Sequence, residues 1–371
     1  MLTPMDDFLI HQTADTIDRV ATSDRNFYDR YYFNCHDLNG ELFMVMGMAA
    51  YPNTGIIDAF VTAVQRNERQ VAVAASRELL GDRSKTVVGP IGVEVQEGLR
   101  RFRVWCDPNE SDLSFDLTFE GITFPYEEPR MLRRAGSRVT MDTSRLTQPG
   151  RWSGKVSIGG EEYQVQHEDW RGARDHSWGV RPVGDPEPQS APDRTGGMRG
   201  WYWNWAPIQF PDYTVMYMIA EEADGTRWLQ SATRLYPYEA NRPPEPLEIV
   251  RHEIKLKPGT RVFDGGVVIL REPGGRELPL EFEPLSLLHM AGVGYAFGKD
   301  FWHHGQYQGE LAVKSVTWDL TDAESVTRIS GHKETSCRAQ FDGQTGHGIF
   351  ELIIAGLYDP YGFKTPGDVA R

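Results

Sequence analysis

The feature of this sequence that most limits its fold is a set of short segments in which apolar and polar residues alternate. Successive side chains of a β-strand point to opposite faces of the sheet, so this period of two predicts strands with one buried face. Dipeptides that favour tight turns, such as Asp224-Gly225 and Asp342-Gly343, lie between such segments. The alternating segments are residues 101–105, 113–120, 278–282 and 311–318.

Helices are predicted to be few. Residues 56–65, with the sequence IIDAFVTAVQ, fit a short helix and a strand equally well. Short strands without long amphipathic helices between them are typical of sandwiches and barrels rather than of βαβ units. The 10 Trp, 15 Tyr and 17 Phe residues point the same way, because large aromatic side chains suit pleated surfaces and apolar pockets. We therefore predict an all-β protein built from antiparallel sheets.

The length of the chain, 371 residues, exceeds what one hydrophobic core usually supports, and this predicts two domains. The strongest break in composition is residues 181–200, RPVGDPEPQSAPDRTGGMRG, which carry four prolines and four glycines. Such a segment has little that can pack, so we interpret it as a loop between domains or over a site. The predicted division is an N-terminal β domain at residues 1–185, a connecting loop at 186–200 and a C-terminal β domain at 201–371.

The net charge of −14 argues against binding to nucleic acid, because an acidic surface repels phosphate backbones. No run of 18 apolar residues occurs, and the first 20 residues lack a basic region followed by an apolar one, so neither a membrane span nor a secretion signal is expected. The three cysteines, Cys35, Cys106 and Cys337, are too scattered for a disulfide framework or a zinc site. We predict a cytoplasmic protein without metal; the sequence does not set its oligomeric state.

The most informative motif is Asp175-His176-Ser177-Trp178-Gly179. On a strand, His176 and Trp178 face one way, while Asp175 and Ser177 face the other. A titratable imidazole beside an indole on one wall of a pocket suits acid–base chemistry. The alternative is that both residues are part of a core and fix the end of a strand, and the pattern alone leaves both interpretations open.

A second aromatic cluster follows the Pro/Gly-rich segment. Trp201, Trp203 and Trp205 share one face of a predicted strand, and Tyr202 and Asn204 share the other. Three indoles in a row suit the wall of an apolar cavity, and their π faces stabilise positive charge. A core plug rich in tryptophan fits the pattern equally well.

These two motifs together resemble the lipocalin-like carotenoid 1,2-hydratase superfamily, which includes AttH-like proteins and, more distantly, tocopherol cyclase and fungal Diels–Alderases. The pentapeptide at 175–179 is shared with an uncharacterised bacterial branch of that group. The resemblance implies two consecutive lipocalin-like (calycin-type) antiparallel β-barrel or sandwich domains with an apolar cavity near their junction. It also implies chemistry on hydrophobic, often isoprenoid, molecules without metal or organic cofactor.

The resemblance assigns a His-x-Trp motif and a downstream Tyr-x-Asp motif to the active site, with the Asp protonating an alkene and the His assisting water. His176-Ser177-Trp178 matches the first motif. The second is replaced by Trp203-Asn204-Trp205, where the acid is missing. A protonating carboxyl group must then come from elsewhere, and the nearby candidates are Glu168, Asp169 and Asp212.

The leading hypothesis is a cofactor-independent hydro-lyase, isomerase or cyclase acting on a hydrophobic small molecule of terpenoid, steroid or polyketide type. His176 is the expected general acid or base, with Asp175 and Tyr202 as supporting polar groups. The alternative is a carrier that binds a lipophilic ligand without chemistry; a structural or chaperone-like protein would have no enclosed pocket. The residues expected to contact the ligand are Trp178, Trp201, Trp203, Asn204 and Trp205.

Overall fold

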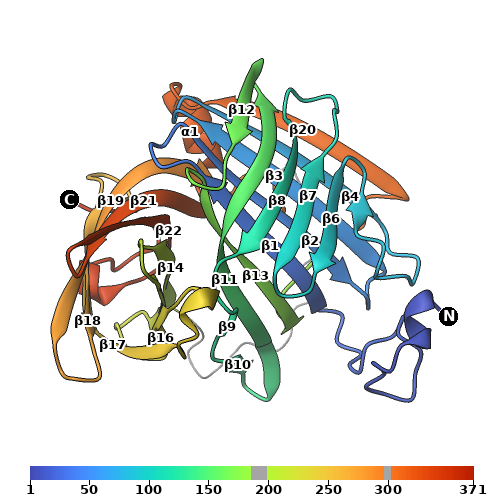
Figure 1. Cartoon of the computed structure of the whole chain (residues 1–371), viewed down its shortest axis with the longest axis horizontal. Coiled ribbons are helices and arrows are strands. Elements are labelled where there is room, and N and C mark those ends of the chain that lie inside the picture. The colour runs from blue at the N-terminus through green and yellow to red at the C-terminus, as the bar shows by residue number, and fades with distance from the viewer. Residues whose placement is uncertain (185–198, 296–301) are drawn as a thin grey trace.

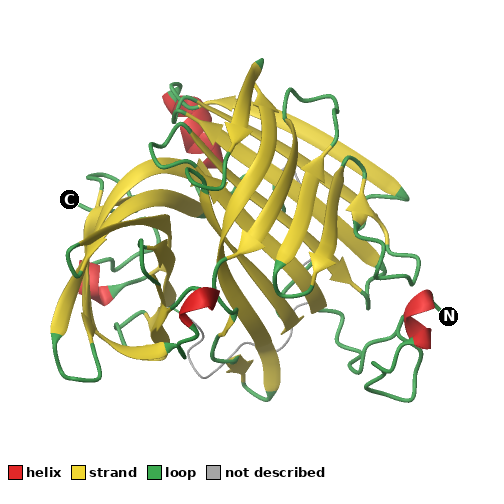
Figure 2. Ribbon diagram, in the orientation of Figure 1, coloured by secondary structure: helices red, strands yellow, loops and turns green. Residues whose placement is uncertain are grey.

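The computed structural model describes residues 1–184, 199–295 and 302–371. In this part of the chain the regular secondary structure is almost entirely β-strand, arranged as two barrels (Figures 1 and 2). The all-β prediction is confirmed. The predicted loop at 186–200 lies outside the described residues except for Arg199 and Gly200. Residues 56–65, which fit helix or strand, form the strand β3.

The first barrel is a sheet of 14 strands that is nearly closed. Its neighbouring strands follow the order β20-β4-β3-β2-β1-β13-β11-β8-β7-β6-β5, and β9, β10 and β12 pair with the long strand β11. The strands of this sheet are β1 (Phe27–His36), β2 (Leu42–Tyr51), β3 (Ile56–Gln65), β4 (Arg69–Glu78), β5 (Val87–Val88), β6 (Ile91–Glu97), β7 (Arg101–Cys106), β8 (Ser114–Gly121), β9 (Tyr126–Glu127), β10 (Met131–Ala135), β11 (Arg138–Ile158), β12 (Glu161–Val165), β13 (Arg171–Val180) and β20 (Leu311–Asp319).

The second barrel is closed and lies beside the first, as the yellow to red strands of Figure 1 show. The strands of this barrel are β14 (Gly200–Gln209), β15 (Thr214–Glu222), β16 (Arg227–Leu235), β17 (Glu245–Leu256), β18 (Phe263–Arg271), β19 (Glu277–His289), β21 (Lys333–Phe341) and β22 (Gln344–Gly356). Helices are short: α1 (Ala323–Ile329) and the 3₁₀ turns Pro4–Asp7, Tyr238–Ala240 and Asp359–Tyr361. No helix of the described residues is long and apolar enough to cross a membrane.

The predicted division into consecutive domains misses one strand. β20 belongs to the C-terminal part of the chain, yet it pairs antiparallel with β4 at the edge of the N-terminal sheet, with Leu311 opposite Arg77. The chain therefore leaves the second barrel after β19, adds an edge strand to the first barrel, and returns through α1 to β21. A strand gives no sign in its own sequence of which sheet it will join, because pairing depends on distant partners.

The strands between the two barrels are buried on both faces. On β2, Met44 and Met46 pack into the core of the first barrel, while Phe43 and Val45 pack into a separate apolar layer between the barrels. The second barrel contributes Trp203, Trp205 and several methionines to that layer. This double burial explains why β2 has the sequence LFMVMGMAAY, in which no polar residue alternates with the apolar ones.

Polar side chains also join the barrels. Gln70 on β4 donates through Nε2 to the carbonyl of His289 at 2.6 Å and accepts from the His289 amide at 3.0 Å. Gln70 is fully buried, so water does not replace these bonds. Gln209 on β14 similarly donates to the carbonyls of Gly150 and Gly172.

We expect Gln70→Met to lower the free energy of unfolding by about 2–4 kcal/mol. The substitution leaves one buried amide and one buried carbonyl unpaired, and each costs about 1–3 kcal/mol. Urea denaturation followed by tryptophan fluorescence measures the effect. The matched control is Gln340→Met, at an exposed position on β21, which should leave the midpoint nearly unchanged; equal midpoints for both variants would contradict the role of Gln70.

Candidate functional site

A cavity of about 1430 Å³ lies between the two barrels. The N-terminal sheet lines it with side chains of β1, β11 and β13, and the second barrel lines it with side chains of β14, β21 and β22. Its size is above the usual range for small-molecule sites, which is about 300–1,000 Å³. The apolar layer between the barrels surrounds the cavity and supplies its aromatic walls.

The N-terminal wall consists of two rows of residues that run across three strands. In one row Arg30 of β1, Ser177 of β13 and Arg145 of β11 lie directly opposite one another. In the next row Tyr32 and Asp175 are paired in the same way. Cross-strand neighbours on one face have Cβ atoms about 4.5–5.5 Å apart, so these polar groups are close together.

The facing wall has a row of its own. Trp205 of β14 is paired with Glu351 of β22, which is paired in turn with Glu334 of β21. Trp203 donates from its indole to Glu351 Oε2 at 2.9 Å, and Trp205 donates to Glu128 Oε1 at 2.9 Å. Two indoles of the aromatic cluster therefore hold carboxylates as well as covering apolar surface.

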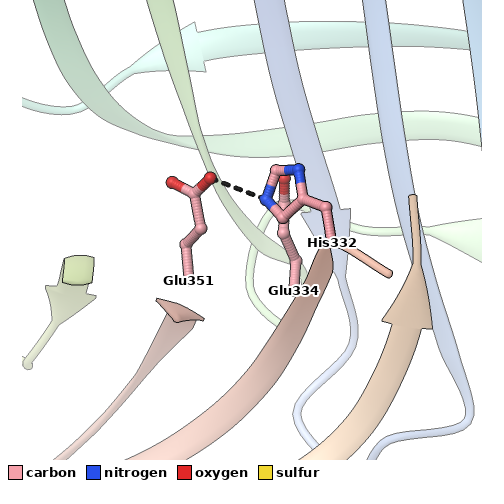
Figure 3. A group of neighbouring side chains, drawn as sticks. All are labelled: His332, Glu334 and Glu351. Carbon is pink, nitrogen blue, oxygen red and sulfur yellow. Dashed lines mark hydrogen bonds and ion pairs between the residues drawn. The ribbon is translucent and has the colours of Figure 1, made fainter. Parts of the chain in front are cut away.

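The pair Glu334–Glu351 is the unusual element of this wall. Two carboxyl groups directly opposite each other repel if both are ionised, and Glu334 is only 2% exposed. The hydroxyl of Tyr32 donates to Glu334 Oε2, and His332 Nε2 lies 2.8 Å from Glu351 Oε1. Figure 3 shows the imidazole of His332 bonded to Glu351, with Glu334 beside them.

Burial and the neighbouring charge of Glu351 raise the pKa of Glu334 well above its ordinary value. Burial also opposes the ionisation of Glu351, but the hydrogen bonds from His332 and Trp203 outweigh it and lower the pKa of Glu351. Burial raises the pKa of the Tyr32 hydroxyl, which keeps its proton and donates to Glu334. The geometry thus places a neutral carboxylic acid opposite an ionised one.

A divalent cation is the alternative to a proton between these carboxyl groups. His332, Glu334 and Glu351 each offer one ligand-type atom, and these atoms lie within 4.8 Å of one another; no other such group occurs among the described residues. The observed hydrogen bonds favour the proton, because His332 Nε2 and both Glu351 oxygens are already engaged within the protein.

The predicted motif at 175–179 divides between two environments. The strand β13 turns Asp175 and Ser177 towards the cavity, where Asp175 Oδ1 is buried and has no hydrogen-bond partner in the described part of the chain. His176 and Trp178 lie on the opposite face. The ring centres of His176 and Tyr31 are 4.7 Å apart with the rings tilted, His176 Nε2 lies 2.7 Å from Asp29 Oδ1, and Trp178 is exposed. His176 and Trp178 are therefore not grouped with the downstream indoles, because the cavity meets the face of β13 that carries Asp175 and Ser177.

The aromatic cluster divides in the same way. Trp201, Trp203 and Trp205 line the cavity, whereas Tyr202 and Asn204 point into the core of the second barrel. Tyr202 stacks between His252 and Tyr358 near a second cavity of about 900 Å³. Neither side chain lines the cavity, although Asn204 Nδ2 donates to the backbone carbonyl of Glu351 at 2.9 Å.

The candidates for the missing acid were wrong in position, since Glu168, Asp169 and Asp212 are all exposed and none lines the cavity. Sequence reasoning missed Glu334 and Glu351. Glu351 carries a signal, because it interrupts the apolar run Ile349-Phe350-Glu351-Leu352-Ile353. Glu334, in the polar stretch KETS, carries none.

We expect the stability of Glu334→Gln to increase relative to that of the unaltered protein as the pH rises. A raised folded-state pKa means that the folded state keeps its proton above pH 4.5 while the unfolded state loses it, so stability falls with pH across that window. Gln does not titrate, and the variant escapes this loss of about 1.4 kcal/mol per pH unit.

Melting temperatures at about pH 5 and about pH 8 measure this difference. Glu283→Gln, at an exposed site on β19, is the matched control and should show no such trend. A bound cation would instead keep both carboxyl groups ionised. In that case the difference in melting temperature between Glu334→Gln and the unaltered protein would not depend on pH and would disappear after treatment with a chelator. That result would overturn the assignment of a proton to Glu334.

Comparison with known proteins supports the architecture. No curated protein matches the chain. Among solved structures, the chain is similar to CghA crystallised with Sch210972, at 9% identity and a TM-score of 0.50, over 90% of this chain and 89% of that one. It is also similar to kievitone hydratase from Nectria haematococca, at 12% identity and a TM-score of 0.46, over 88% of this chain and 89% of that one.

At such identities the likeness to CghA shows the fold alone, two lipocalin-like barrels side by side. A family model matches residues 2–364, which is nearly the whole sequence. The chain therefore belongs to the family of unknown function DUF8625.

Proposed function

We propose that this protein is an enzyme that protonates a hydrophobic small molecule in the cavity between its barrels. The observation that carries the proposal is the buried carboxyl of Glu334 directly opposite Glu351, where burial and that neighbouring charge raise the pKa of Glu334. A carboxylic acid that stays protonated near neutral pH serves as a general acid, and burial beside a like charge is the usual way to obtain one.

In the proposed step, Glu334 transfers its proton to an unsaturated carbon or to a carbonyl oxygen of the substrate. Its Oε2 accepts the Tyr32 hydroxyl, so the transferable proton resides on Oε1. The positive charge that develops on the substrate faces the carboxylate of Glu351 and the π surfaces of Trp203 and Trp205. Glu334 regains a proton from the substrate itself or from an added water.

The source of that returning proton decides the reaction. A proton taken from another carbon gives isomerisation or cyclisation, and a proton taken from water that has added to the cation gives hydration; the reverse gives dehydration. All three belong to the hydro-lyase, isomerase and cyclase group expected for this fold. Kievitone hydratase, which has a similar structure, is named for a hydration, but at 12% identity and a TM-score of 0.46 it carries no weight here.

The competing proposal is a carrier that binds a lipophilic ligand without chemistry. It is favoured by the fact that Glu334 and Glu351 already have hydrogen-bond partners within the protein. It does not account for two carboxyl groups placed opposite each other in an otherwise aromatic wall, since an apolar pair would be less costly there.

The function is tested by incubating the protein in D₂O with a panel of apolar alkenes, polyenes and enones. Turnover appears as gain or loss of one water, or as an isomer carrying deuterium. We expect Glu334→Gln to lower the rate by about 10²–10⁴-fold, the usual contribution of a positioned acid. Glu283→Gln should retain full activity. If the protein binds these compounds but every one is recovered unchanged, the function is that of a carrier.

A second variant separates the two possible acids. We expect His176→Ala to keep most of the activity, because its imidazole lies on the face of β13 away from the cavity and is paired with Asp29. The same incubations measure it. A loss of about 100-fold or more in His176→Ala, with Glu334→Gln fully active, would return the chemistry to His176.

A further inference from the structure

Arg30 is a buried cation that the proposed proton transfer does not use. It lies on β1, lines the cavity and is only 4% exposed. Its Nε and Nη2 atoms have no hydrogen-bond partner among the described residues. A guanidinium is rarely buried unless it is paired, because an unsatisfied charged donor is costly to take out of water.

The surroundings of Arg30 hold the side chain in place without satisfying it. Its guanidinium carbon lies 5.2 Å from the ring centre of Tyr295 and 5.6 Å from that of Phe60. Cation–π contacts of this kind fix the plane of the guanidinium but accept none of its N–H groups in the manner of a carboxylate. Tyr295 also hydrogen-bonds to the guanidinium, and the carboxyl group of Asp175 lies near enough to interact with its charge. Nε and Nη2 still lack an acceptor among the described residues, so these two donors are held in place for one.

A second unsatisfied donor lies in the same row of the sheet. Ser177 lies between Arg145 and Arg30 in this row, and Arg145 Nη2 is also buried with no partner in residues 1–184, 199–295 and 302–371. Glu128 and the rings of Trp203 and Trp205 hold the rest of the Arg145 side chain. Two fixed guanidinium groups on one wall, with free N–H donors, form a site for an anionic oxygen.

We propose that Arg30, assisted by Arg145, binds an anionic oxygen of the substrate, so that the substrate is a hydrophobic acid: an apolar skeleton bearing a carboxylate or an enolate. This inference rests on the proposed function in taking the cavity as the substrate site. It adds a substrate class that the acid–base pair alone does not define.

The position of Arg30 links this subsite to the chemistry. Tyr32 is two residues further along β1 on the same face, at a distance of about 7 Å along the strand, and it bonds to Glu334. A substrate whose oxyanion contacts Arg30 therefore has its reacting carbon only a few bonds away, at the proton of Glu334. The two groups together define which end of the molecule is protonated.

Two fluorescent probes that differ in one anionic group test the subsite. 1-Anilinonaphthalene-8-sulfonate carries a sulfonate, and N-phenyl-1-naphthylamine has the same aromatic frame without it. We expect both probes to bind the unaltered protein. Arg30→Met should lower the affinity for the sulfonate probe by about 10- to 100-fold, the usual range for a lost hydrogen bond to a charged group. The neutral probe should change by less than about twofold, because the apolar walls are intact.

Matched variants keep the result interpretable. Arg103→Met removes the same charge from an exposed position on β7 and should leave both probes unaffected. Arg30→Lys keeps the charge but loses the planar fork, and we expect an intermediate loss. A melting curve shows whether each variant is folded. If Arg30→Met does not fold, the binding of the two probes is compared in Arg30→Lys instead.

The outcomes distinguish this inference from the proposed function. Equal weakening of both probes in Arg30→Met, or undiminished binding of the sulfonate, would overturn the anion subsite while leaving Glu334 untouched. Glu334→Gln should retain the preference for the sulfonate probe even if it abolishes turnover. Loss of that preference in Glu334→Gln, with Arg30→Met unaffected, would likewise overturn the assignment to Arg30.

Discussion

The arrangement of the site depends on two glutamates that the strand register places directly opposite each other. Glu334 and Glu351 belong to neighbouring strands of a closed barrel, so neither can move away without breaking the ladder. Their repulsion is relieved by keeping one of them protonated. The hydrogen-bond partners decide which one: His332 and Trp203 favour the ionised form of Glu351, and Tyr32 lies against Glu334. Cross-strand pairing, an ordinary feature of a sheet, thus raises the pKa of Glu334.

Much of the fold could be predicted from the sequence, because the period of two is a local property. The segments at 101–105, 113–120, 278–282 and 311–318 are all strands in the structure. The same rule correctly divided residues 175–178 and 201–205 between two faces. What it could not give is which face meets a cavity, since both faces of β1, β2 and β13 are covered and the choice depends on how the barrels pack.

The site was predicted only in part, for the same physical reason. The indoles Trp201, Trp203 and Trp205 were singled out because three large apolar side chains on one face need a partner surface. The carboxyl groups were sought near the known motifs, but pairing between β14, β21 and β22 brings them from 129 and 146 positions beyond Trp205. Long-range pairing leaves no local trace, apart from the single glutamate that interrupts an apolar run at 351.

Charged groups of opposite sign meet across the cavity, and this couples the site to the packing of the barrels. The N-terminal sheet supplies Arg30 and Arg145, and the second barrel supplies Glu351 with the protonated Glu334 opposite it. In either barrel alone these groups would face water. Docking removes them from water, so each barrel offsets part of the desolvation of the other. Arg30 stays unsatisfied even so, and an anionic ligand that completes its hydrogen bonds would stabilise the contact between the barrels as well as its own position.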